Sequence, residues 1–229
     1  MSPLEDPRLA FELDWPLLVL SFLIGSIPWG VVVSRLFYKR DIRSSGSGNI
    51  GAANALRTLG RKAGAAVLIL DALKGVAAVL VCGLLLSNSL GTGAHRGWNT
   101  FADDSWQFAP AHALFAVAGH CYTPWLRFGG GKGVATFLGA AFAMSWEAGL
   151  AFVACWLGIV LPTGIASAGS IFATCVAGGL IAIQYGGLYH SPLPGFSMFG
   201  AVLLIVWKHR ENIARLRAGT ENRLQLLKR

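Results

Sequence analysis

Long apolar segments dominate this sequence and restrict the folds open to it. The residues from Leu13 to Phe37 are apolar apart from Asp14, three serines and Arg35. A helix needs about 20 such residues to cross a bilayer. Charged residues make up only 13% of the chain, whereas soluble domains carry about 25%. The sequence therefore predicts an all-α integral membrane protein.

Seven membrane crossings can be drawn, some of them short or broken. They cover residues 14–37, 62–86, 108–124, 134–146, 148–163, 167–185 and 195–208. Several are shorter than a straight spanning helix requires. Short or glycine-interrupted segments are typical of broken helices that line a polar cavity. We expect one polytopic domain over residues 1–229.

Basic residues gather in three segments: the 39–62 loop, the 127–132 loop and the tail after Trp207. The positive-inside rule places such segments in the cytoplasm. An odd number of crossings puts all three on one face, with the C-terminus cytoplasmic and the N-terminus and the 87–107 loop outside. The net charge is +8. Because the basic residues form no solvated stripe interleaved with aromatics, we expect no nucleic-acid partner.

A polar, glycine-rich stretch, SGSGNIGAANALR, occupies residues 45–57 between apolar segments. Successive glycines let backbone N–H groups form a nest for anions, and a helix starting near Ala52 would add its N-terminus. The candidate donors in the loop are Gly46, Ser47, Gly48, Asn49 and Gly51. Arg57 lies in that helix, where a guanidinium can bind two phosphate oxygens at once. The spacing matches neither a Walker A nor a dinucleotide motif, so a flexible loop with a membrane-flanking arginine is the alternative.

Two further polar segments accompany this loop on the basic face. FGGGKGV, residues 128–134, is a glycine turn with Lys132 at the start of a helix. A lysine there opposes the helix dipole, so it makes better sense as a charge held towards an anion than as a helix stabiliser; an ordinary loop lysine is the alternative. In KHRENI, His209 and Asn212 are three residues apart and share a helix face. The arginines at 210, 215 and 217 are interpreted as interfacial anchors.

Other polar residues lie inside the apolar segments. Asp71 and Lys74 are three residues apart and can form an ion pair that orients the cytoplasmic loops, with a catalytic role as the alternative. Ser170, near the start of the sixth crossing, either contacts a ligand or bonds the helix backbone. His120 is interpreted as a packed core histidine. The four cysteines have no metal-ligand spacing, so we expect neither a disulfide nor a structural metal.

The polar residues of the basic face supply hydrogen-bond donors and fixed positive charge, without a strong nucleophile beside a base. No GxSxG elbow is present. A phosphorylated ligand fits, since a phosphate ester carries up to about two negative charges. Because the site faces the cytoplasm and opens into the bilayer, one soluble phosphate and one lipid chain would suit it. A transporter of a phosphorylated solute and a non-catalytic scaffold are the alternatives.

SGSGNIGAANALR, DALKG, GHCYTPWLRFGGGKGVAT and KHRENIARL together resemble the bacterial membrane glycerol-3-phosphate acyltransferase family that uses acyl phosphate as donor. The resemblance covers most of the chain, with three cytoplasmic motifs in order. The family usually has threonine where this chain has Ala53. The H-x4-D motif of acyltransferases that use acyl-CoA or acyl carrier protein is absent, because no histidine is followed five residues later by an acidic residue.

The resemblance implies transfer of an acyl group from acyl phosphate to the 1-hydroxyl of glycerol 3-phosphate, giving lysophosphatidate and phosphate. It implies a monomeric enzyme of the bacterial inner membrane, functionally linked to an enzyme that makes acyl phosphate, with no cofactor and no metal. Ser47, Arg57, Lys132 and His209 are the expected catalytic residues. The expected phosphate-binding residues are Gly46, Ser47, Gly48, Asn49, Gly51, Asn54, Arg57, Gly130, Gly131, Lys132, Ser170, His209 and Asn212.

For the mechanism we expect direct attack by the glycerol hydroxyl in a ternary complex. An acyl phosphate is already activated, so a strong protein base is less necessary. Preorganised donors would then supply the largest catalytic term. The donor's own phosphate can accept the proton, with His209 as the rival base. Ser47 as a covalent nucleophile is a third possibility.

Overall fold

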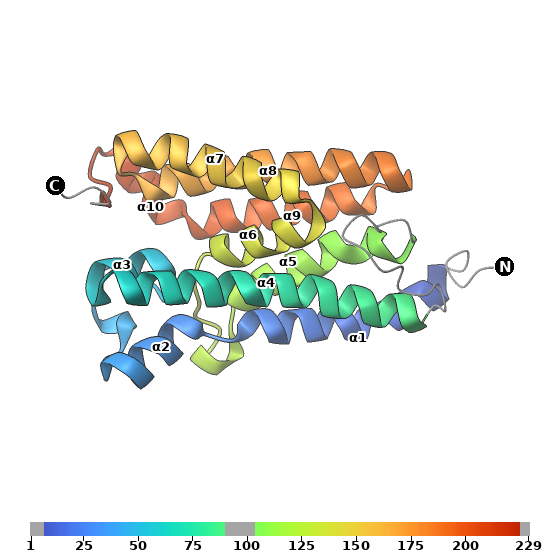
Figure 1. The fold of residues 1–229 in the computed structure, drawn as a ribbon, viewed down its shortest axis with the longest axis horizontal. Coiled ribbons are helices and arrows are strands. Elements are labelled where there is room, and N and C mark those ends of the chain that lie inside the picture. The colour runs from blue at the N-terminus through green and yellow to red at the C-terminus, as the bar shows by residue number, and fades with distance from the viewer. Residues whose placement is uncertain (1–6, 90–103, 225–229) are drawn as a thin grey trace.

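A computed structural model describes residues 7–89 and 104–224 of the chain as an elongated helical bundle (Figure 1). The described residues form α-helices and short 3₁₀ turns, without strands. The helices are α1 (Pro7–Ser26), α2 (Trp29–Tyr38), α3 (Ala52–Leu59), α4 (Arg61–Ser89), α5 (Ala109–Cys121), α6 (Val134–Met144), α7 (Trp146–Thr163), α8 (Ala166–Tyr189), α9 (Leu193–Lys208) and α10 (Arg210–Arg217). The 3₁₀ turns are η1 (Ile42–Ser44), η2 (Asp104–Phe108) and η3 (Pro124–Leu126).

Each predicted apolar segment coincides with helix, and the first of them is broken. Four segments are long and apolar enough to cross a membrane: Asp14–Tyr38, Arg61–Ser89, Trp146–Thr163 and Ala166–Leu188. The apolar helix α6 has 11 residues, which is about 16 Å and half of a hydrocarbon core. Most of the predicted 87–107 loop, residues 90–103, lies outside the described residues.

The break in the first segment, between α1 and α2, falls at Ile27 and Pro28. Proline has no N–H and disfavours helix at the residue before it, so it ends α1. The Ile27 carbonyl freed by the break accepts a hydrogen bond from Lys74 Nζ at 2.8 Å. Thr123 Oγ1 donates to the Ser26 carbonyl at 2.6 Å. The predicted crossing at 14–37 is therefore two helices whose junction is hydrogen-bonded by other parts of the bundle.

Paired glycines allow two helix crossings to be unusually close. Where α1 crosses α5, a Cβ on Gly25 would collide with the Ala116 backbone, and one on Gly119 with the Phe22 backbone. The same reciprocal arrangement occurs where α4 crosses α6, at Gly75 and Gly139. In lipid, burial of apolar surface does not drive helices to associate, so close packing through small residues takes that role. These two crossings set the spacing of the helices around the site.

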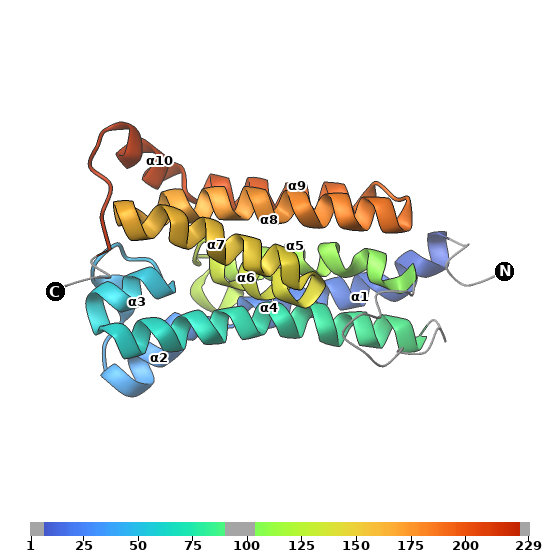
Figure 2. The same cartoon turned by 45° about the horizontal axis from the view of Figure 1, so that its top comes forward.

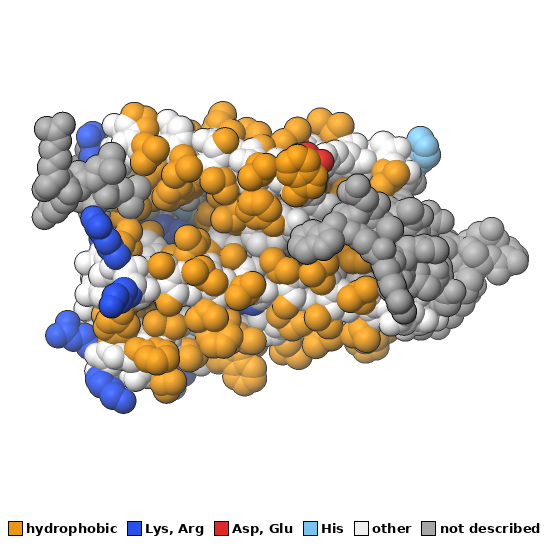
Figure 3. Space-filling view, in the orientation of Figure 1, with side chains coloured by type: hydrophobic (Ala, Val, Ile, Leu, Met, Phe, Trp, Pro, Cys, Tyr) orange, Lys and Arg blue, Asp and Glu red, His pale blue; other side chains and the backbone are white. Residues whose placement is uncertain are grey.

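The surface of the bundle has an apolar middle and one basic end (Figure 3). Large hydrophobic side chains such as Phe37, Ile183 and Phe196 are about three-quarters exposed. A soluble protein rarely exposes so much contiguous apolar surface, whereas a membrane protein presents it to lipid. The basic end is the one at which α2, α3 and α10 lie (Figures 1 and 2). The predicted motif segments therefore share one end of the molecule.

Candidate active site

A cavity of about 360 Å³ opens near the basic end, between α3, α4, α6, α7, α8 and α10. This volume is in the range of small-molecule sites. Its walls are mostly apolar, and its polar residues come from all three predicted motif segments. The predicted residues on its lining are Ser47, Asn49, Gly51, Asn54, Arg57, Lys132, Ser170, His209 and Asn212. Gly46, Gly48, Gly130 and Gly131 are not on the lining.

The first motif loop is built around the buried side chain of Asn54 in α3. Asn54 Oδ1 accepts a hydrogen bond from the Ser47 N–H at 2.9 Å. Its Nδ2 donates to the carbonyls of Ile42, Ser45 and Asn49 at 2.9–3.1 Å. An amide nitrogen has only two hydrogens, so this group is fully used inside the loop. These bonds indicate that Asn54 shapes the loop, and its contact with a phosphate stays a prediction.

The predicted backbone nest is likewise occupied by the loop itself. The Gly48 N–H donates to the Ser45 carbonyl at 3.1 Å, and the Gly51 N–H to Asn49 Oδ1 at 2.9 Å. Gly46 has a φ of +63°, and a Cβ there would collide with Asn54 Oδ1. The glycines are needed for the fold of the loop, and the N–H groups of Gly48 and Gly51 are not presented to an anion.

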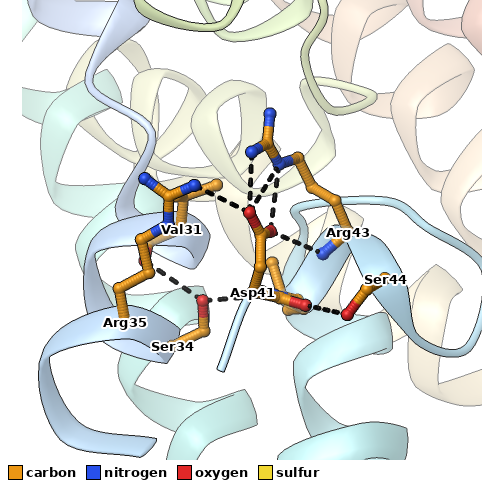
Figure 4. Close-up of polar contacts among 7 residues, drawn as sticks. Val31, Ser34, Arg35, Asp41, Arg43 and Ser44 are labelled. Carbon is orange, nitrogen blue, oxygen red and sulfur yellow. Dashed lines mark hydrogen bonds and ion pairs between the residues drawn. The ribbon is translucent and has the colours of Figure 1, made fainter. Parts of the chain in front are cut away.

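Asp41 fastens the loop to the end of α2 (Figure 4). Its carboxylate accepts hydrogen bonds from Arg35 Nη2 at 2.8 Å and Arg43 Nη2 at 2.7 Å. Hydrogen bonds from Arg43 outweigh the opposing effect of burial and lower the pKa of Asp41 well below its usual value. Ser34 Oγ donates to the Val31 carbonyl and accepts from the Ile42 N–H. Arg35 and Arg43 are thus paired outside the cavity, and they support the loop structurally.

Arg57 and Ser47 are the groups of this loop that are free to bind a ligand. Within 7–89 and 104–224, no hydrogen bond or salt bridge engages the Arg57 guanidinium or Ser47 Oγ. Burial lowers the pKa of Arg57, but an arginine remains charged in proteins. Both side chains line the cavity, so the loop contributes one fixed positive charge and one hydroxyl.

The second motif segment places Lys132 just before α6. Gly133, with a φ of +83°, caps this helix, and the half-buried ammonium of Lys132 donates a hydrogen bond to Asn212 Oδ1. Burial is the main cause that lowers the pKa of Lys132 to about 8. Gly130 and Gly131 pack against the end of α5, where the Gly131 N–H donates to the His120 carbonyl at 3.0 Å. Both glycines allow the turn to approach α5, and the N–H of Gly131 is used inside the fold; phosphate binding by these two glycines stays a prediction.

His209 and Asn212 both line the cavity, but they do not share the face of one helix as predicted, because His209 lies at the junction of α9 and α10. His209 Nδ1 lies 2.8 Å from the Ile205 carbonyl, so Nδ1 carries the hydrogen. Burial, followed by the charge of Lys132, lowers the pKa of His209 to about 4. At neutral pH the ring is uncharged, and its Nε2 can only accept a hydrogen bond. This property suits a ligand hydroxyl better than a fully ionised phosphate.

Glu221, beyond α10, belongs to the site although sequence reasoning missed it. Its carboxylate accepts hydrogen bonds from Asn212 Nδ2 at 2.6 Å, Arg215 Nε at 2.8 Å and Ser167 Oγ at 3.0 Å. Burial alone would raise its pKa, but these bonds outweigh burial and lower it. The basic tail after Trp207 contains two acidic residues, Glu211 and Glu221, and these were the available signal. Arg215, predicted to be an interfacial anchor, is instead half of this ion pair.

The predicted ion pair between Asp71 and Lys74 is present on α4 beside the cavity, with 2.8 Å between Oδ1 and Nζ. Both side chains are almost fully buried. His120 joins them, since its Nδ1 lies 2.8 Å from Lys74 Nζ. Asp71 and His120 also line the cavity, so His120 is more than the packed core residue that the sequence predicted.

Ser170 lies at the cavity on α8, and its hydroxyl accepts a hydrogen bond from Trp156 Nε1 at 3.2 Å. The Ser170 hydroxyl can still donate its own hydrogen. The hydroxyl of Ser167, one turn earlier, already donates its hydrogen to the carboxylate of Glu221. Ser170 is therefore the serine of α8 that has a hydrogen to offer a ligand.

Replacing Asn54 with alanine tests the role of this side chain in the loop. We expect a lower thermal unfolding transition in detergent and a loss of activity together, because the loop carbonyls that share the two amide hydrogens lose their donor. The loss at the buried Ile42 carbonyl alone costs about 1–3 kcal/mol. Asn54→Asp should be no better, since it places an acceptor against those carbonyls. Thr58→Ala, on the next turn of α3, serves as the control. Lost activity with an unchanged unfolding transition would show that Asn54 contacts the ligand directly.

A helical bundle with an apolar surface and a cavity lined by Arg57 and Lys132 at its basic end is typical of an integral membrane protein that handles an anionic ligand. Comparison with known proteins identifies the family. A family model described as glycerol-3-phosphate acyltransferase matches residues 15–219. The chain belongs to this family, which makes it an acyltransferase.

Individual relatives cover nearly the whole chain. A glycerol-3-phosphate acyltransferase of Gluconobacter oxydans is 40% identical over 91% of both chains. One from Nitrobacter winogradskyi is 43% identical over 89% of this chain and 92% of the relative. The crystal structure of PlsY (YgiH), an integral membrane glycerol 3-phosphate acyltransferase, in its glycerol 3-phosphate form, has a TM-score of 0.74 at 35% identity and covers 92% of this chain and 95% of PlsY. The lysophosphatidic acid form of PlsY gives a TM-score of 0.71.

Proposed function

We propose that this protein transfers a fatty acyl group from acyl phosphate to the 1-hydroxyl of glycerol 3-phosphate, releasing lysophosphatidate and phosphate. The observation that carries the proposal is one cavity with Arg57 and Lys132 at its polar end and leucine, valine and phenylalanine side chains on its walls. Two phosphates must approach each other in this reaction, and two fixed cations offset their repulsion. The apolar wall suits the acyl chain.

We assign the phosphate contacts to Arg57, Lys132, Ser47 and Ser170, which have donors free or able to turn to a ligand. Asn212 holds Lys132 and is itself held by Glu221. His209 presents Nε2 to the cavity as an acceptor. No metal or cofactor is required, because phosphate is a good leaving group and the donors are fixed before the substrates arrive.

The reaction proceeds by direct attack in this proposal. The glycerol oxygen forms a bond to the acyl carbon, and the bond from that carbon to the phosphate oxygen breaks. The hydroxyl proton passes to the leaving phosphate, or to His209 Nε2 if that nitrogen is the base. Ser47 Oγ lacks a basic side chain as hydrogen-bond partner among residues 7–89 and 104–224, which favours a donor role for it over a covalent one.

We propose that the basic end faces the cytoplasm of a bacterium, with the protein in the inner membrane. Seven segments then enter the bilayer, with α1 and α2 together as the first and the short α6 included. This orientation puts the N-terminus outside and the C-terminus in the cytoplasm, and it follows the positive-inside rule. The protein acts as a monomer and receives its acyl phosphate from a separate enzyme.

The test is turnover by purified protein in detergent or lipid, with acyl phosphate or acyl-CoA and glycerol 3-phosphate. We expect phosphate release and lysophosphatidate in equal amounts with acyl phosphate alone, and no acylated protein by mass spectrometry. Turnover only with acyl-CoA would overturn the donor assignment. A covalent acyl adduct that disappears in Ser47→Ala would overturn direct attack. Uptake of phosphorylated solute into vesicles without any product would show that the protein is a transporter.

A further inference from the structure

His120, on the last turn of α5, has one ring nitrogen fixed and the other unused. Its Nδ1 lies 2.8 Å from Lys74 Nζ. An ammonium group has only hydrogens to donate, so Nδ1 is the acceptor and the single proton of the neutral ring sits on Nε2. In the part of the chain that the structure describes, no hydrogen bond engages Nε2. His120 therefore presents an N–H donor whose tautomer Lys74 sets.

The position of this donor lies between the polar and the apolar part of the cavity. On one side, a Cβ at Gly131 would collide with His120 Nε2, which places the ring against the residue next to Lys132. On the other side, His120 Nδ1 is 3.6 Å from Asp71 Oδ1. Asp71 is one turn along α4 from Leu68, which is part of the apolar wall. His120 thus lies where the charged head of a ligand would join its chain.

In an acyl donor, the group between the phosphate and the chain is the reacting carbonyl. We propose that His120 Nε2–H donates a hydrogen bond to the carbonyl oxygen of the acyl donor and stabilises the negative charge that develops there; this inference rests on the acyl-transfer function proposed above. As the glycerol oxygen attacks, the carbonyl π electrons move onto that oxygen and the N–H···O bond strengthens. The electrons return when phosphate leaves, so the ring proton stays on His120 throughout.

The charges around His120 favour a carbonyl over a phosphate at this point. The Asp71 carboxylate lies beside the ring and has no hydrogen bond of good geometry within the described residues, although Lys74 pairs with it. A phosphate dianion next to this carboxylate would be repelled. A neutral carbonyl is not, and the partial negative charge that it gains can be met by the N–H donor. Lys74 is a positioning residue here, since it fixes the tautomer without lining the cavity.

The experiment compares His120→Gln with His120→Asn under saturating substrates. The glutamine amide nitrogen can reach the Nε2 position, whereas the shorter asparagine amide cannot. Removing one oxyanion donor typically lowers kcat by about 10²–10³-fold. We expect His120→Asn to show such a loss of kcat, with the KM for glycerol 3-phosphate nearly unchanged. The kcat of His120→Gln should be at least tenfold higher than that of His120→Asn. Thermal unfolding in detergent reports whether both variants fold.

Equal kcat in His120→Asn and the unchanged protein would overturn the inference. Equal losses of kcat in the two folded variants would also overturn it. If His120 only packed against its neighbours, the position of the amide nitrogen would not affect kcat. A raised KM for glycerol 3-phosphate at unchanged kcat would place His120 on the acceptor instead. Acyl phosphates and thioesters both contain the carbonyl, so the comparison uses whichever donor supports turnover. Failure of acyl phosphate as a donor is therefore seen in the unchanged protein and is distinct from failure of the role of His120.

Discussion

Replacing Arg57 with alanine is expected to lower kcat/KM by about 10³-fold. A guanidinium that binds two phosphate oxygens makes two charge-assisted hydrogen bonds, each contributing about 1.5–3 kcal/mol. Arg57 is solvent-accessible and free of salt bridges within residues 7–89 and 104–224, so its loss should leave the fold intact. Steady-state kinetics with glycerol 3-phosphate as the varied substrate measure the effect.

Arg57→Lys separates the charge from the geometry of the guanidinium. It keeps the positive charge and loses the paired donors, so we expect an intermediate loss of activity. Arg61→Ala is the control, because Arg61 begins α4 at the same basic end and does not line the cavity. Full activity in Arg57→Ala, or equal losses in Arg57→Ala and Arg61→Ala, would remove Arg57 from the site.

Replacing Lys132 with methionine is expected to have an effect of similar size, about 10²–10³-fold in kcat/KM. Methionine fills nearly the same space and removes the charge, so the change isolates the ammonium group. Lys62→Met is the control, since Lys62 is exposed near the start of α4 and outside the cavity. If both variants kept full activity, Lys132 would be only a topology-setting residue of the loop.

The same lysine predicts the shape of the pH profile. The pKa of Lys132 is lowered to about 8, so the ammonium loses its proton as the pH rises through that value. Because kcat/KM reports the free enzyme, it should fall on the alkaline side with a midpoint near 8. Lys132→Arg should abolish this alkaline fall, since a guanidinium stays charged. His209, with a pKa of about 4, should add no acidic limb above pH 5.

Much of the fold was predictable because the thickness of the bilayer sets the length of the apolar segments, and this length can be read in the sequence. Helix α3 and the ion pair between Asp71 and Lys74 followed from local spacing. The convergence of the basic segments on one end followed from charge. The break at Pro28 was missed, although proline gives a local signal, because the apolar run continues without interruption on both sides of it.

The roles of the individual polar residues were less predictable, because they depend on which donors remain free. Sequence shows that Asn54 and the loop glycines are polar or permissive, but only the fold shows that they satisfy one another. Glu221 and Ser167 are 54 residues apart and meet only in three dimensions. The orientation of His120 depends on Lys74, on a different helix. Such long-range pairings leave no periodic trace in the sequence.

The fold-back of the chain after α10 has a consequence for biosynthesis. Glu221 accepts a hydrogen bond from Asn212, and the Leu224 N–H donates to the Gly164 carbonyl at 2.7 Å. The cavity thus draws its lining from residue 47 to residue 222. When the ribosome is still translating α9, Arg57 and Lys132 have already been synthesised. The segment with Glu221, which holds Asn212 in place, has not yet been made. The protein therefore becomes competent only after Glu221 has been translated, and products truncated before Glu221 should enter the membrane as inactive helical bundles.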